Sequence, residues 1–129
     1  MSARQLPATD AIAFQLAALL EQYEQSIDDL TSAGFDAALY GRVSRELGDM
    51  RLLCARLPLL SVAWVHLLIS HAELMHDLWR EAPGSAATPA AEHCRARHLL
   101  AIRALRQQCL AHFIRTEHTA GPAREQRLS

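Results

Sequence analysis

Apolar side chains recur every three or four residues along most of this chain, which is the spacing of α-helices that bury one side. The first two runs each hold six such positions: Ile12, Leu16, Leu19, Tyr23, Ile27 and Leu30, then Leu39, Val43, Leu47, Met50, Cys54 and Leu57. They predict helices over about residues 10–30 and 35–56, the first capped by Thr9 or Asp10. The connection at residues 31–34 is short, so the two helices are expected to be antiparallel neighbours.

The third run, over residues 59–80, is apolar on nearly all sides. Its polar side chains fall in one narrow stripe that we expect to face water, formed by His66, Ser70, Glu73, Asp77 and Arg80. One neighbouring helix cannot cover so wide an apolar arc, so this helix should lie between at least two others, in a bundle core or at a dimer seam. Trp64 and Leu67 are predicted to be core residues. Pro58 either starts this helix or kinks a continuous one, and we favour a break because an unbroken helix over residues 35–81 would be about 70 Å long.

The uncharged segment of residues 57–69 raises the question of a membrane helix. Thirteen residues span only about 20 Å, less than the roughly 30 Å hydrocarbon core. Extending the segment adds His71, Glu73, His76 and Asp77. The first ten residues also lack the apolar stretch and small-residue cleavage site of a secretory signal. We therefore expect no membrane association and a cytoplasmic location.

The last helix is predicted over residues 89–118, with Thr88 as N-cap and Pro89 in the first turn. It follows a linker at residues 81–88, is stopped near Gly121 and Pro122, and leaves a mobile tail at residues 122–129. It is longer than the other helices, so its end should project. The expected fold is therefore one all-α domain over residues 1–129, an antiparallel four-helix bundle with a long C-terminal helix.

Composition bears on the fold class, the redox compartment and the source genome of the protein. Aromatic residues make up 5% of the chain, and five Gly and five Pro are present, a balance that suits helices better than strands. Three Cys without clustered spacing indicate a reducing compartment. Arginine carries all the positive charge, because the chain has no Lys, and we interpret this as codon bias in a GC-rich, bacterial genome.

The net charge of −1 hides an asymmetry along the chain. Residues 1–41 contain one Arg and six carboxylates, whereas residues 82–129 contain seven Arg and three Glu. We expect the acidic first helix to pack beside the basic last one; the alternative, a basic face for nucleic acid, is less favoured because the arginines are sparse. Arg106 lies on the apolar side of its helix, where it could extend to solvent, pair with Glu24 or Asp28, or hold an anionic ligand.

All seven histidines lie between residues 66 and 118, which suggests a metal site. Two Cys/His pairs share one face of the last helix, Cys94 with His98 and Cys109 with His112. The pairs are about 22 Å apart, so only two antiparallel copies of the helix could close Cys2His2 sites. The alternative is that Cys and His simply belong to the apolar face. His71 is interpreted as a hydrogen-bonded core residue, with a role as a ligand or pH sensor as the second possibility.

No catalytic motif, glycine-rich phosphate loop or Cys-x-x-Cys pair occurs in the sequence. We therefore predict a non-enzymatic protein-interaction module, an adaptor, regulator or chaperone-like protein, that needs no cofactor and forms a homodimer. The second hypothesis is a metal- or haem-binding sensor that uses His71 and the Cys/His face. Trp79, with Phe113 and Ile114, is predicted to border the interface, since an aromatic residue at a helix end is less often enclosed and Trp is enriched in binding hot spots.

Overall fold

The computed structural model describes residues 8–33, 36–80 and 88–128, with side chains up to His112. All regular structure in these ranges is helical: α1 (Ala8–Ala33), α2 (Ala37–Cys54), the 3-10 helix η2 (Pro58–Leu60), α3 (Ser61–Arg80) and α4 (Pro89–Leu128). The prediction of an all-α chain is confirmed. The predicted linker at residues 81–88 lies outside the described residues except for Thr88.

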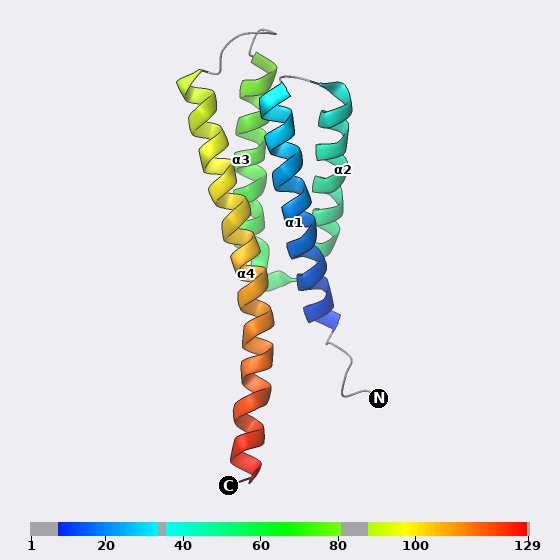
Figure 1. Ribbon diagram of the computed structural model, residues 1–129, viewed down its shortest axis with the longest axis vertical. Helices are drawn as coiled ribbons and strands as arrows, with labels where there is room; N and C mark the ends of the chain where they lie inside the picture. Colours follow the sequence, from blue (N-terminus) through cyan, green and yellow to red (C-terminus); the bar gives the residue numbers. More distant parts are fainter. Residues whose placement is uncertain (1–7, 34–35, 81–87, 129) are drawn as a thin grey trace.

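The four long helices lie side by side with nearly parallel axes, and successive helices run in opposite directions (Figure 1). α1 packs against α2 and α4, and α3 packs against α4. α4 extends well past the ends of the other helices (Figure 1). Among the described helices, α4 is the long helix that packs closely along α3.

The helix boundaries follow local chemistry. α2 ends at Cys54, and Pro58 is the first residue of η2, so the helix is interrupted near Pro58 as expected. Leu57 adopts φ −128° and ψ 74°, outside the helical region. Asp36 caps α2 by accepting hydrogen bonds from the backbone amides of Ala38 and Leu39. The expected cap of α1 is wrong, because α1 begins at Ala8 and so takes up both proposed cap residues in its first turn.

α4 starts as predicted, but it ends later. The Thr88 hydroxyl accepts a hydrogen bond from the Ala91 amide at 3.1 Å, the geometry of an N-cap. The helical backbone then continues to Leu128, past the expected stop near Pro122. A proline within a helix removes one backbone hydrogen bond but does not force the helix to end. Helix, not an irregular tail, therefore occupies residues 122–128.

The core is built from the inner faces of all four long helices. α1 contributes Leu16, Leu20, Tyr23 and Leu30, α2 contributes Val43 and Met50, and α4 contributes Ile102 and Leu105, all nearly inaccessible to solvent. From α3, Leu67 is fully buried and Trp64 is buried, as predicted for both. Burial of these side chains is the main source of stability in a domain of this kind.

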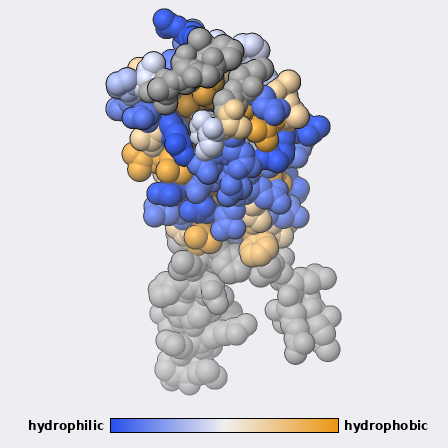
Figure 2. All heavy atoms as spheres, turned by 45° about the horizontal axis from the view of Figure 1, so that its top comes forward, coloured by the Kyte–Doolittle hydropathy of each residue, from blue (hydrophilic) through white to orange (hydrophobic). Residues whose placement is uncertain are grey.

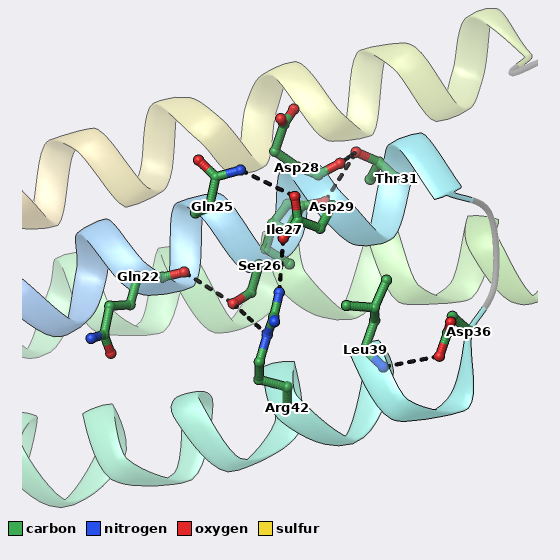
Figure 3. Close-up of polar contacts among 10 residues, drawn as sticks. All are labelled: Gln22, Gln25, Ser26, Ile27, Asp28, Asp29, Thr31, Asp36, Leu39 and Arg42. Atoms are coloured by element: carbon green, nitrogen blue, oxygen red, sulfur yellow. Dashed lines mark hydrogen bonds and ion pairs between the residues drawn. The ribbon is translucent and has the colours of Figure 1, made fainter.

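Charged side chains join α1 to both of its neighbours. Arg42 of α2 reaches Asp29 at 2.9 Å and the Ser26 hydroxyl at 3.1 Å on α1 (Figure 3). On the other side, Arg95 of α4 pairs with Asp28 at 2.5 Å. The expected pairing of the acidic first helix with the basic last one is confirmed. These pairs are exposed or half-exposed, so each adds little stability, but together they favour this arrangement of neighbours.

Candidate functional site

A chain of hydrogen bonds crosses the centre of the domain and joins three helices. The hydroxyl of Tyr23 on α1 lies 2.5 Å from Nδ1 of His71 on α3 and 2.7 Å from Nε2 of His98 on α4. The other ring nitrogen of His98, Nδ1, lies 2.6 Å from the hydroxyl of Ser70. Tyr23 and His98 are fully buried. Buried polar groups need such partners, because an unpaired one costs about 1–3 kcal/mol.

The direction of each bond follows from its neighbour. The Ser70 hydroxyl donates to the backbone carbonyl of Leu67, so its oxygen accepts the Nδ1 proton of His98. Neutral His98 then has an unprotonated Nε2, which accepts the hydroxyl proton of Tyr23. The Tyr23 oxygen in turn accepts the Nδ1 proton of His71. Every proton in the relay, defined as Tyr23, His71, His98 and Ser70, therefore has an acceptor.

Burial keeps the relay uncharged. It lowers the pKa of His71 to about 4 and that of His98 to about 3, with the nearby His71 adding to the shift of His98. Burial also raises the pKa of Tyr23 well above its usual value, and the carboxylate of Glu46 on α2 adds to this. Both histidines are therefore neutral at pH 7, which agrees with the bond directions. His71 is hydrogen-bonded as expected, but it lies at the edge of the core, because its side chain is only partly buried.

Replacing Tyr23 by phenylalanine should lower the free energy of unfolding by about 1–3 kcal/mol, because Nε2 of buried His98 loses its donor. Urea titration followed by circular dichroism measures this. In a double-mutant cycle of Tyr23→Phe with Ser70→Ala, the losses of unfolding free energy should not be additive, because both substitutions remove hydrogen-bond partners of the His98 ring. Additive effects would show that the two hydroxyls do not act through His98.

The four Cys and His residues proposed as metal ligands do not form the expected surface site. His98 and Cys109 are buried at 0% and 1% exposure, so neither can reach a second chain. Cys94 is hydrogen-bonded to Asp77, and Nε2 of His112 lies 3.7 Å from Oδ1 of Asp10. The predicted cross-dimer Cys2His2 sites are therefore wrong: the face these residues share looks largely into the core. Among the described residues, no three His, Cys, Asp or Glu side chains gather as a metal ion would require.

The thiols are also held in the unreactive form. Burial, with the neighbouring Cys109, raises the pKa of Cys54 to about 12, and burial raises that of Cys109 to about 11. The hydrogen bond to Asp77 raises the pKa of Cys94 to about 11. Since the thiolate is the nucleophile and the metal ligand, these cysteines are poorly suited to either role at neutral pH.

Arg106 takes one of its three expected positions. Its Nη1 lies 3.5 Å from a carboxylate oxygen of Glu24, and Arg103 approaches the same oxygen at 3.8 Å. Both partners in the Arg106 pair are 27% exposed, so the pair sits at the edge of the core. Glu24 therefore supplies the anion at this position.

The face that α3 presents to water overlaps only in part with the predicted one. Ser70 is buried, Glu73 pairs with Arg97 of α4 at 2.9 Å, and Asp77 contacts Cys94. The prediction that these three residues face water is wrong, because α4 packs on that side of α3 and supplies polar partners. His66 and Arg80 of the predicted polar stripe are exposed as expected, and so is Ser61. The other six exposed residues of α3 follow a heptad spacing of alternate three- and four-residue steps: Val62, Val65, Ile69, Ala72, His76 and Trp79.

We refer to these six residues as the outward face of α3. Val62 is 67% exposed, Ile69 50% and Trp79 61%, so large apolar side chains meet solvent along the whole helix. A groove of about 570 Å³ between α3 and α4 adjoins this face, with Val62 and Ile69 on one side and Leu100 on the other. Trp79 also contacts Tyr40 of α2, edge to face at a ring separation of 5.9 Å. Phe113 and Ile114, the other predicted interface residues, have side chains outside the described set.

Surface apolar residues elsewhere are more scattered. In the view of Figure 2 hydrophilic residues predominate and hydrophobic ones form separate patches. Phe14 on α1 and Leu52 on α2 are also exposed, and an individual exposed apolar residue is ordinary for a folded protein. By length and composition alone, the stretch Pro58–Arg80 could cross a membrane, a test that a core helix also passes. The run along α3 is therefore the surface feature that needs an explanation.

No family model, curated protein or solved structure matches this chain. Its function has to be argued from the relay and from the outward face of α3. The sequence pointed to His71 but not to Tyr23 or Ser70 as its companions. Tyr23 occupies an apolar position of its helix, and a hydroxyl there requires a buried partner, which is the signal that could have revealed the relay.

Proposed function

We propose that this chain is an antiparallel four-helix bundle that acts as a non-enzymatic protein-interaction module and works as a homodimer. The observation that carries this proposal is the heptad spacing of the exposed residues on the outward face of α3. Apolar residues at these positions form the seam of a coiled coil, in which side chains of one helix insert between those of another. Such a surface fits a helix better than it fits a small ligand or an extended strand.

A second copy of the chain is the occupant that the charges favour. No Asp, Glu, Lys or Arg occurs among the six residues, so two copies of this face meet without repulsion. A dimer with two-fold symmetry places one surface against its own copy, which a charged surface would resist. Of the charged residues that adjoin this face in sequence, Glu73 pairs with Arg97, Asp77 contacts Cys94, and Arg80 is exposed at the end of the helix beside Trp79.

The interior supports a scaffold role more than a chemical one. The ring nitrogens of His98 and the Tyr23 hydroxyl are committed to hydrogen bonds, and the thiols stay protonated. A satisfied polar network in a core fixes which helices meet and in what register. Three free cysteines, at positions 54, 94 and 109, are in keeping with the proposed bacterial cytoplasm.

The proposal is tested by Ile69→Glu, which places a carboxylate in the middle of the seam. By light scattering we expect the wild-type protein to have the mass of two 14.3 kDa chains and the variant to have the mass of one. The dissociation constant should rise by about 30-fold or more, since a central interface position contributes about 2 kcal/mol or more. Helix content should be unchanged.

Phe14→Glu is the matched control. Phe14 is 66% exposed, comparable to the residues of the outward face, but it lies on α1. This variant should remain dimeric. A wild-type chain that scatters as a monomer at high concentration would refute the homodimer, and if such a monomer floated with lipid vesicles, α3 would instead be a membrane-binding surface.

A further inference from the structure

We infer that the two copies pair through α3 in antiparallel orientation, with the two-fold axis beside the Ser70–His71 peptide. This inference rests on the proposed function and specifies its geometry. Ile69 then packs on the partner's Ala72, Val65 on the partner's His76, and Val62 on the partner's Trp79. In each pair the two residues lie equally far from the axis along the helix. The two-fold symmetry therefore repeats each pair once on either side of the axis, and all six positions of the outward face take part.

Side-chain size favours this register. It places Trp79, the largest residue of the face, against a valine, and it places Ile69 against Ala72, the smallest. Seams pack well when large and small residues face one another, because the layers then have similar volumes. A parallel pair would set each residue against its own copy, leaving a void between two Ala72 residues and crowding two Trp79 residues into one layer.

Charge points to the same orientation. His76 is the one titratable residue of the outward face, and in the antiparallel pair it meets the partner's Val65. A parallel pair would place two polar His76 rings side by side in one layer of the seam, where neither would face an apolar side chain. Antiparallel helices also align their dipoles favourably, since the positive N-terminal end of each lies beside the negative C-terminal end of the other.

Cross-linking distinguishes the two orientations. The variant Val65→Cys/His76→Cys is made in a Cys94→Ser background, which removes the one native thiol that is not buried. Val65 and His76 are both exposed. In the antiparallel dimer Cys at 65 lies against the partner's position 76, whereas two copies of position 65 are about 16 Å apart along the helix. A bis-maleimide shorter than this separation is therefore the probe.

We expect about tenfold more covalent dimer from the double variant than from either single variant, because linking within a bound pair is intramolecular. Efficient linking of the single variants would overturn the antiparallel orientation and leave the homodimer intact. A chain that is dimeric by light scattering but is not linked in any variant would overturn the use of this face. A chain that is monomeric by light scattering would refute both the orientation and the proposed function.

Discussion

Replacing Leu67 by alanine should lower the free energy of unfolding by about 2–5 kcal/mol, the range for removing a fully buried leucine side chain. Leu67 is 0% exposed at the middle of α3, and its backbone carbonyl also accepts the hydrogen bond from Ser70 that ends the relay. The substitution leaves that carbonyl in place, so the loss should come from packing alone. Urea denaturation followed by circular dichroism at 222 nm measures it.

Leu59→Ala provides the comparison, since Leu59 is a leucine of the same segment that is 70% exposed. It should change the free energy of unfolding by about 0.5 kcal/mol or less, as expected for a surface substitution. If Leu67→Ala cost under about 1 kcal/mol, the middle of α3 would not be packed as the structure shows. Both measurements should be made at one protein concentration, because the proposed dimerisation would add to the apparent stability.

Acidification from pH 7 to pH 5 should destabilise the domain by about 2–4 kcal/mol, because two histidines must stay neutral in the folded state. The pKa of each is near 6.5 in the unfolded chain, but burial lowers it to about 4 for His71 and about 3 for His98. Below pH 6.5 the unfolded chain therefore binds protons that the folded chain does not. Stability is at its full value above this pH and falls as the pH drops toward the folded-state pKa values.

The double variant Tyr23→Phe/His98→Leu isolates one of the two titrating groups. It replaces both partners of the Tyr23–His98 hydrogen bond by apolar side chains, which is less costly than leaving one partner unpaired. Because it also removes the acceptor of the His71 Nδ1 proton, it is compared with Tyr23→Phe, which shares that loss and keeps His98. About half of the loss of stability between pH 7 and pH 5 should disappear in this variant. Unfolding free energies at several pH values would show this, and a pH dependence equal to that of wild type would exclude His98 as a source.

The sequence by itself determined the helices and much of their pairing. Periodic apolar residues predict α1 and α2 closely, since a helix that buries one side must repeat its apolar positions every three or four residues. Thr88 and Pro58 mark helix starts through local hydrogen bonding and a fixed φ angle, which need no tertiary contact. The opposite charges of the first and last helices likewise anticipated the Arg95–Asp28 pair.

Only the tertiary structure decided which side of α3 is covered. The helix is apolar over most of its circumference, so its pattern does not say which residues face a neighbour. Polar residues were assigned to water, yet Ser70 and Glu73 face α4, because His98 and Arg97 supply partners there. Water and a polar side chain both satisfy a hydrogen-bonding group, so polarity alone cannot distinguish them.

The same limit applies to the Cys and His residues of α4. Angles around a helix showed that Cys94, His98, Cys109 and His112 share one face, which is a property of the sequence. Whether that face looks outward depends on the positions of α1, α2 and α3, which bury His98 against Tyr23 and Cys109 near Cys54. The hydrogen-bonded relay joins residues 48 and 75 positions apart, a separation that no local pattern encodes. Sequence periodicity therefore determined the elements, and contacts between distant residues decided which polar groups are buried and which apolar face of α3 stays exposed.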